Sequence, residues 1–314
     1  MAFIIGVDLG GTNLRAALAD ESGTIHAEVR KPTQAEHGPE HVINRIIACI
    51  DEVKQSLPHG AKLLGVGVGS PGPLDPFAGV VFTMPNLPGW NDTPLRAILE
   101  QRLGLPVELG NDANAAALGE WMFGAGRGLQ NMVYCTISTG IGGGVISEGK
   151  LILGERGAAT EVGHHVIDWR TRESWEDLAS GTGMARRAAA AMRATPTTIL
   201  HQIATPDLVN AGDVAQAAAQ GDRLALQLLD EEGELLGVGL VNMLHLFSPS
   251  LIALGGGVIT NNPQLLDRAR KVVQERALSQ IYREARIQIA ELGDRVGILG
   301  AVALFLHMRL GRSA

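Results

Sequence analysis

Aromatic side chains and cysteine are scarce in this chain. Only 4% of its 314 residues are aromatic, and its two cysteines, Cys49 and Cys135, lie far apart in apolar segments. Free cysteine in such segments usually behaves as a small hydrophobic residue, so we expect no disulfide framework. The apolar run from Ala2 to Val7 stops at Asp8 and is too short for a signal peptide. These absences predict a soluble protein of a reducing compartment, the cytoplasm.

Long apolar runs and an excess of positive charge are also missing. The C-terminal run from Ile298 to Met308 has 11 residues, whereas a membrane-spanning helix needs about 20. Lys and Arg number 26 against 33 Asp and Glu, which gives a net charge of -7. This balance leaves no electrostatic footprint of a nucleic-acid binder. We therefore expect neither a membrane nor a nucleic acid as a partner.

Glycine, in contrast, is abundant, with 40 residues. The glycines follow no period of three, which excludes collagen, and a hydrophobic content of 46% is enough for a large core, which argues against disorder. At about 150 residues per domain, the length suggests two domains.

Apolar segments that alternate between strand and helix patterns indicate an α/β architecture. The patterns predict strands at Phe3–Val7, Leu14–Leu18, Leu64–Gly69, Leu105–Leu109 and Leu251–Leu254. They predict helices at Thr93–Gly104, Ala113–Phe123, Asp222–Phe247 and Pro263–Leu278.

An internal similarity links two segments about 130 residues apart. The segment Cys135–Ile146 aligns with Ile5–Ala16, which places Ser138 on Asp8 and Gly140 on Gly10. The alignment predicts two similar halves, each of which opens with a hairpin that has a glycine turn.

Two generic phosphate-binding motifs match only in part. The segment Gly144–Lys150 fits G-x-x-x-x-G-K, but Leu151 replaces the Ser or Thr that would hold Mg²⁺, and Ser147–Lys150 has the composition of a hairpin turn. The segment Gly67–Gly72 fits G-x-G-x-x-G, but prolines follow and no helical period opens there. Neither match predicts a nucleotide site.

The glycine turns after Asp8 and Ser138 are more informative, because both lie between apolar strands and carry a hydroxyl, from Thr12 and Thr139. Hydroxyls and backbone N–H groups could together bind phosphate oxygens, which only glycine lets approach so closely. A carboxylate such as Asp8 is costly beside phosphate unless Mg²⁺ lies between them. A pair of tight structural hairpins is the alternative.

Four segments together resemble the ROK family of sugar kinases and repressors. They are Asp8–Thr12 followed by Arg15, Asn111–Ala117, the glycine pattern from Ile137 to His164, and Leu254–Gly257. The resemblance covers essentially the whole chain. It implies the actin-like, hexokinase-type (ribonuclease H-like) two-domain ATPase fold.

The resemblance further implies that the protein transfers the γ-phosphoryl group of ATP to a hexose with the help of Mg²⁺. We expect glucose, which would give glucose 6-phosphate, with fructose, mannose or N-acetylmannosamine as alternatives. The implied domains are residues 1–113 with 296–314, a small domain with a returning C-terminal helix, and residues 114–295, a large one. Family members are commonly homo-oligomers, so we expect a dimer.

The resemblance also assigns site residues. Asp112 would be the catalytic base, with a helix N-cap as its structural alternative, and Asp8 would hold Mg²⁺ through water. ATP and its phosphates would contact Gly10, Gly11, Thr12, Asn13, Thr139, Gly140, Gly255, Gly256 and Gly257. The sugar would contact Gly72, Asn86, Asn111, Asp112, Glu161, His164 and Glu176. Glu176 as a surface helix residue and His164 as an ordinary histidine are the alternatives. Five clusters of glycines, one of them Gly65, Gly67, Gly69 and Gly72, are expected to mark where nucleotide and sugar meet the backbone.

In one place the chain departs from the family pattern. Many members place a cysteine motif after Gly-His that binds a structural zinc with that histidine, but no cysteine lies between His164 and Glu176. His164, His165 and Asp168 also lack a fourth ligand at a recognised spacing. We therefore expect no zinc, and we expect Trp169 and Trp175 to pack in the shortened segment.

Two functions without catalysis compete with the kinase. A sugar-responsive repressor of the family would need a helix-turn-helix module before the kinase-like part, whereas Met1 lies only a few residues before Asp8. A sugar-binding regulator would not need Asp112 and both phosphate turns, which are intact. The kinase is therefore preferred.

Overall fold

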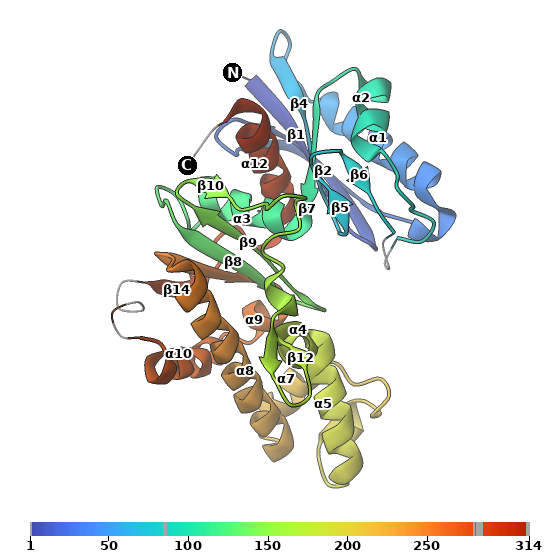
Figure 1. Cartoon of the computed structure of the whole chain (residues 1–314). Coiled ribbons are helices and arrows are strands. Elements are labelled where there is room, and N and C mark those ends of the chain that lie inside the picture. Colours follow the sequence, from blue (N-terminus) through green and yellow to red (C-terminus); the bar gives the residue numbers. More distant parts are fainter. Residues whose placement is uncertain (1, 84–86, 279, 281–284, 312–314) are drawn as a thin grey trace. The chain divides into compact units, whose positions relative to one another are not determined.

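The computed structural model of the chain describes residues 2–83, 87–278, 280 and 285–311 (Figure 1). The chain forms two compact units, and it passes between them several times. The first unit comprises Met1–Gln130, Gly144–Thr160 and Glu291–Ala314, and the second comprises Asn131–Gly143 and Glu161–Ala290. The domain boundary expected between residues 113 and 114 falls inside a helix that belongs wholly to the first unit.

A five-stranded sheet forms the centre of the first unit, in the order β3-β2-β1-β4-β7. Its strands are β1 (Ala2–Leu9), β2 (Asn13–Asp20), β3 (Ile25–Pro32), β4 (Lys62–Ser70) and β7 (Val107–Asn111). The strand β1 pairs with β2 antiparallel and with β4 parallel, and β4 pairs with β7 parallel. The carboxyl ends of β1, β4 and β7 therefore share one edge of the sheet.

Helices cover both faces of this sheet. They are α1 (Pro39–Lys54), α2 (Leu95–Leu103), α3 (Asp112–Phe123) and α12 (Val296–Leu310). Successive side chains of β1 point to opposite faces: Phe3 and Ile5 join the core beneath α1, whereas Ile4 packs with Val302 and Phe305 of α12. Short elements complete the unit: η1 (Ala35–His37), β5 (Leu74–Asp75), β6 (Val80–Val81) and η3 (Gly293–Arg295).

Glycines let α12 approach the sheet closely. A Cβ added at Gly67 would overlap the backbone carbonyl of Ala301, and one at Gly65 would overlap the ring of Phe305. These two glycines were expected to mark a ligand-contacting cluster, together with Gly69 and Gly72. That expectation is wrong for Gly65 and Gly67, because the C-terminal helix occupies the space beside them.

The second sheet has the order β10-β9-β8-β13-β14. Its strands are β8 (Met132–Ile137), β9 (Ile141–Ser147), β10 (Lys150–Leu151), β13 (Leu251–Gly255) and β14 (Arg286–Ile289). In each sheet, three strands that follow one another in the chain lie next to two strands that come later: β1–β3 next to β4 and β7, and β8–β10 next to β13 and β14. In the first sheet, the run of three begins with the antiparallel pair of β1 and β2. The shared order confirms the similarity of the two halves that the sequence predicted.

Most of the helices belong to the second unit. They are α4 (Trp175–Ala179), α5 (Gly181–Ala194), α6 (Leu200–Ile203), α7 (Ala211–Ala219), α8 (Arg223–Phe247), α9 (Gly257–Asn261) and α10 (Gln264–Arg276). The unit also contains η2 (Val162–His164) and the paired strands β11 (Val166–Asp168) and β12 (Glu173–Ser174). Asp222 caps α8 by accepting the N–H of Ala225.

Every strand and helix that the sequence predicted is present, with ends shifted by a few residues. Glu148 and Gly149, both at positive φ, form the turn between β9 and β10, which confirms a hairpin in place of a P-loop. Cys49 and Cys135 are free and buried, and burial raises the pKa of the Cys135 thiol to about 12. Within the described part of the chain, no helix combines the length and hydropathy needed to cross a membrane.

Candidate active site

The first glycine turn joins β1 to β2 and is stabilised by Thr33. The Thr33 hydroxyl donates to the Gly10 carbonyl at 2.6 Å, and the Thr33 N–H donates to the Thr12 carbonyl at 2.8 Å. Within the turn, the Gly10 N–H donates to the Asn13 carbonyl. Thr12 itself is exposed. The turn is thus a fixed loop that presents a hydroxyl to solvent, and Thr33 is a supporting residue that the sequence did not reveal.

Asp8 lies at the carboxyl end of β1, directly before this turn. A Cβ added at Gly297 of α12 would overlap the Asp8 carboxylate, so the glycine leaves room for this side chain. Burial raises the pKa of the Asp8 carboxyl, and the charge of Arg15, its partner across the hairpin, opposes this shift. A hard cation such as Mg²⁺ prefers carboxylate and hydroxyl oxygens, and the oxygens of Asp8 and Thr12 fit that preference.

The Asn-Asp motif spans the end of β7 and the start of α3. Asn111 is the N-cap of α3, because its Oδ1 accepts the N–H of Ala113 at 2.9 Å and that of Asn114 at 3.2 Å. Asp112 occupies the first helical position and is exposed. The alternative reading of Asp112 as the N-cap is therefore wrong, since its neighbour does that work.

Two acidic residues of the first unit, Asp8 and Asp112, lie close together at the edge of the sheet. Asp8 is in register with Gly69 of β4, and a Cβ at Gly69 would lie 3.8 Å from the Asp112 Cα. A Cβ at Gly72 would lie 3.5 Å from the Asn111 side-chain amide. Gly72, Asn111 and Asp112, which the resemblance assigns to the sugar, are thus neighbours; their contact with sugar stays a prediction. Asn86, the remaining predicted sugar residue of this unit, lies outside the described residues.

The second glycine turn, Ser138–Ile141, is held by the junction of α4 and α5. Gly181 donates its N–H to the Ser138 carbonyl at 2.7 Å. Thr182 donates its hydroxyl to the Thr139 carbonyl at 2.8 Å and its N–H to the same oxygen at 3.2 Å. The Ile141 N–H donates to Glu176 Oε2 at 2.7 Å. Thr182 is a further residue that sequence reasoning missed, although the glycines on either side of it form a visible cluster.

Gly255–Gly257 span the junction of β13 and α9, beside the same turn. Gly256 has a φ of 88° and precedes the helix as its N-cap. A Cβ there would overlap the backbone of Ile137, the last residue of β8. The predicted adenosine loop and the predicted phosphate turn are therefore adjacent in the second unit.

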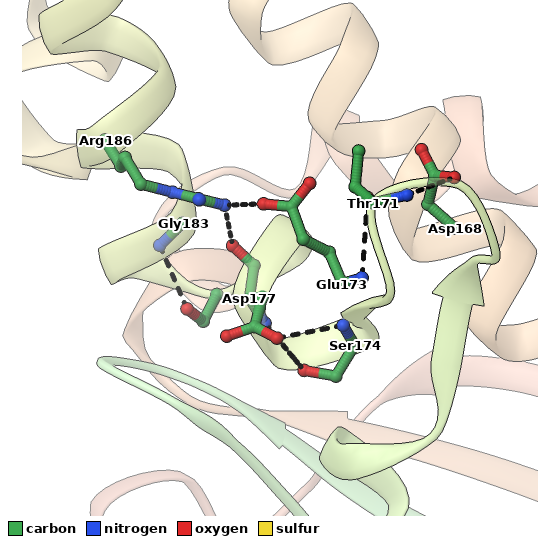
Figure 2. Close-up of polar contacts among 8 residues, drawn as sticks. Asp168, Thr171, Glu173, Ser174, Asp177, Gly183 and Arg186 are labelled. Atoms are coloured by element: carbon green, nitrogen blue, oxygen red, sulfur yellow. Dashed lines mark hydrogen bonds and ion pairs between the residues drawn. The ribbon is translucent and has the colours of Figure 1, made fainter.

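Glu176 lies on the short helix α4, whose position is fixed by polar contacts (Figure 2). Ser174 and Asp177 form a capping box: the Ser174 hydroxyl accepts the Asp177 N–H at 3.1 Å, and Asp177 Oδ2 accepts the Ser174 N–H at 2.9 Å. The Ser174 hydroxyl also donates to Asp177 Oδ2 at 2.7 Å, and the bonds that this carboxylate accepts, that from the Ser174 N–H above all, hold the pKa of Asp177 below its ordinary value. Arg186 of α5 pairs with the Glu173 carboxylate and donates to the Asp177 carbonyl at 2.9 Å.

Glu161 and His164 lie at the two ends of η2, with the His164 N–H bonded to the Glu161 carbonyl at 3.1 Å. Both are exposed. His165, in contrast, is half-buried and packs against the ring of Trp175 at a centroid distance of 5.5 Å. The tight turn thus exposes Glu161 and His164 to solvent, whereas His165 faces the interior.

The shortened segment after His164 is the hairpin β11–β12. Asp168 Oδ1 accepts the Arg170 N–H at 2.8 Å and so closes its turn. Trp175 is fully buried, as expected, but the expectation for Trp169 is wrong: it is 76% exposed, with the Arg170 guanidinium over its ring. A tryptophan at a hairpin tip has no core to join.

Over residues 2–83, 87–278, 280 and 285–311, no group of three His, Cys, Asp or Glu side chains is placed to hold a metal. The absence of zinc stays a prediction.

The model of the ROK family matches residues 4–308 of the chain. Glucokinase of Thermotoga maritima is 36% identical over 316 residues, which cover 98% of each protein. A putative xylose repressor of Caldicellulosiruptor sp. is 30% identical over 98% of this chain and 78% of its own length.

The fold has a close counterpart among solved structures. A ROK family glucokinase from Streptomyces griseus, crystallised with glucose and AMPPNP, superposes with a TM-score of 0.80 at 34% identity and covers 96% of this chain and 99% of that one. The two mixed sheets therefore have the fold of the ROK sugar kinases. Since the family model and full-length relatives agree, this chain belongs to the ROK family.

Proposed function

We propose that this protein is an ATP-dependent sugar kinase, with glucose as its first candidate substrate and glucose 6-phosphate as the product. The observation that carries the proposal is the common sheet edge that joins Asp8 and Asp112 in the first unit. A carboxylate able to attract Mg²⁺ and a carboxylate able to accept a proton are the two acidic groups that phosphoryl transfer to a hydroxyl needs. Full-length similarity to glucokinases supports the same reading.

The nucleotide is assigned to loops in both units. In the first unit, the turn Gly10–Asn13 would contact phosphates, and Asp8 would hold Mg²⁺ through water. In the second, Thr139, Gly140 and Gly255–Gly257 would contact ATP. When bound, Mg²⁺ would neutralise charge that develops on the phosphate oxygens. The raised pKa of Asp8 reflects burial, and a cation beside it would favour its ionised form.

The sugar would contact Gly72 and the polar side chains of Asn86, Asn111, Asp112, Glu161, His164 and Glu176. Carboxylate, imidazole and amide groups suit a ring of hydroxyls, because each accepts or donates hydrogen bonds in fixed directions. Of these residues, Asn111 also has a structural duty as the N-cap of α3.

The proposed reaction is a single displacement. A sugar hydroxyl oxygen forms a bond to the γ-phosphorus as the bond from that phosphorus to the bridging oxygen of ATP breaks, and ADP leaves with the electron pair. Asp112 accepts the hydroxyl proton. Its place in the first turn of α3 favours the ionised carboxylate, since the helix N-terminus carries partial positive charge. Because the transition state is largely dissociative, Asp112 would act mainly by orientation and late proton transfer.

A panel of hexoses tests the proposal, with ADP release as the readout. We expect turnover with glucose, ATP and Mg²⁺, and the runner-up substrates are fructose, mannose and N-acetylmannosamine. Sugar binding without turnover of any hexose would contradict a kinase and favour a sugar-binding regulator. Size-exclusion chromatography with light scattering would test the dimer that we also propose. We further propose a cytoplasmic location, which fits an enzyme that uses ATP.

A further inference from the structure

The carboxylate of Glu176 does structural work on the second glycine turn. Its Oε2 accepts the Ile141 N–H at 2.7 Å, in a contact that joins residues 35 positions apart. The carboxylate packs so closely on Gly140 that an added Cβ there would overlap it. A charge-assisted hydrogen bond of this kind is among the stronger ones in proteins. Glu176 and the turn thus form one unit of structure.

The position of Glu176 is itself fixed before any ligand binds. The capping box of Ser174 and Asp177 defines the start of α4, and Trp175 is fully buried, with its indole N–H bonded to the Leu235 carbonyl at 3.1 Å. Arg186 satisfies the carbonyl of Asp177 at the end of this five-residue helix (Figure 2), where backbone oxygens lack helical partners. Glu176 therefore projects from a rigid support.

The remaining contacts of the turn complement the one from Glu176. Gly181 and Thr182 donate to carbonyl oxygens of Ser138 and Thr139, whereas Glu176 accepts from the N–H of Ile141. The junction of α4 and α5 therefore holds the turn at both ends. Loss of the Glu176 bond would release the end that follows Gly140.

We infer that Glu176 is a positioning residue for the nucleotide-binding turn Ser138–Ile141, in addition to its proposed contact with sugar. This inference rests on the proposed function, which assigns ATP phosphates to Thr139 and Gly140. Since Oε2 is committed to the turn, Oε1 is the oxygen that would meet a sugar hydroxyl. The same carboxylate thus serves both substrates, and its loss weakens nucleotide binding even when no sugar is present.

Calorimetric titration of the full-length protein with AMPPNP and Mg²⁺, without sugar, tests this inference. We expect Glu176→Ala to weaken nucleotide binding about tenfold or more, as the loss of a hydrogen bond to a charged group would. Glu176→Gln should bind nucleotide within about threefold of wild type, because its amide oxygen can still accept the Ile141 N–H. Sugar affinity, measured separately, should fall in both variants.

Two further variants separate positioning from simple loss of a sugar contact. Glu161→Gln changes a proposed sugar residue that is exposed at the N-cap of η2, and it should weaken sugar binding while nucleotide affinity stays unchanged. Glu176→Asp leaves the turn itself unchanged but shortens the side chain by one methylene group, which withdraws the carboxylate from the Ile141 N–H, so it should weaken nucleotide binding as Glu176→Ala does. Circular dichroism shows whether each variant is folded, and Glu176→Asp provides the test if Glu176→Ala is not.

The outcomes distinguish the inference from the function on which it rests. If wild type binds AMPPNP and both Glu176→Ala and Glu176→Asp bind it equally well, Glu176 does not position the turn and the inference is overturned. If wild type itself binds no AMPPNP, the proposed function fails at this site and takes the inference with it. Weak nucleotide binding by Glu176→Ala with recovery in Glu176→Gln supports both the inference and the proposed function.

Discussion

Asn111 and Asp112 are adjacent residues with separate duties. Asn111 caps α3 through the N–H groups of Ala113 and Asn114, so the helix does not depend on the neighbouring carboxylate for its cap. Asp112 is exposed in the first turn, where the helix N-terminus favours a negative charge. Asp112 Oδ1 also accepts the Ala113 N–H, at 2.8 Å, so the carboxylate is held at the start of the helix while Asn111 keeps the cap.

Substitution Asp112→Asn should therefore reduce turnover without unfolding the protein. We expect kcat to fall on the order of 10²-fold or more, the usual range for a lost general base, while the melting temperature changes little because Asn111 keeps the cap. Steady-state kinetics with the preferred hexose and thermal unfolding provide the measurements. Asp267→Asn, which alters an exposed aspartate in the first turn of α10, is the matched control and should retain full activity. Near-normal turnover in Asp112→Asn would remove this residue as the base.

Asp20, at the end of β2, should make stability depend on acidity. Burial favours its protonated form, but hydrogen bonds from His26, Ser22 and Thr24 prevail and lower its pKa to about 2 from 3.8. Because the folded-state value is the lower one, the stabilisation is complete above pH 3.8 and is lost as pH falls through about 2. It amounts to about 2 kcal/mol.

Urea unfolding of Asp20→Asn and wild type across this range measures the effect. The difference in unfolding free energy should be largest near neutral pH and should shrink below pH 3.8. Asp51→Asn on the exposed face of α1 is the control, with little difference from wild type at any pH. A difference for Asp20→Asn that stays constant down to low pH would contradict the proposed role of its ionised carboxylate.

At the scale of elements, the contact of α12 with β4 depends on glycine at particular positions. Gly67→Ala would force a Cβ into the backbone carbonyl of Ala301, which no change of rotamer can relieve. We expect a loss of about 3 kcal/mol, the upper part of the usual range for an overpacked core, as measured by urea unfolding.

Gly69→Ala on the same strand is the matched control. Its added Cβ would meet the Ala115 Cβ at 3.5 Å, an ordinary contact distance. This variant should therefore unfold at nearly the same urea concentration as wild type. Equal stability of the two variants would show that α12 shifts to accept the extra methyl group.

These glycines also show which part of the fold could be predicted from sequence. The period of apolar residues was enough for β1, β4 and α8, because it is a local property of each segment. Gly65 and Gly67 were assigned wrongly to a ligand-contacting cluster, since the helix that requires them lies more than 200 positions away in the chain. Thr33, Thr182 and Arg186 were missed for the same reason: their partners are set by packing, and no local pattern marks them.

In the candidate site, too, some features are marked by sequence motifs and others are not. The positions of Asp8, Asp112 and the glycine turns follow from motifs at strand ends, and the order of the strands in the first sheet shows why Asp8 and Asp112 lie at one sheet edge. The bond from Glu176 to the second turn does not follow from any motif. It depends on a helix of five residues whose direction is set by a capping box and an arginine.

At the scale of the whole molecule, the fold should not require a structural metal. The capping box, the buried Trp175 and Arg186 fix the segment after His164 through the chain's own contacts. Treatment with a chelator, followed by dialysis and assay with added Mg²⁺, should leave both activity and melting temperature unchanged. Elemental analysis should find no stoichiometric zinc in the purified protein. A fall in melting temperature that zinc alone restores would contradict this expectation.

The packing of α12 has a consequence for the order in which the protein can fold during synthesis. This helix covers the face of the first sheet that contains Ile4 and Ala19, yet the ribosome makes it after every other described helix and strand. Until then that apolar face stays uncovered, although its strands were among the first to emerge. Exposed apolar surface on incomplete chains favours aggregation, so the nascent first unit is a natural substrate for chaperones until its last helix arrives.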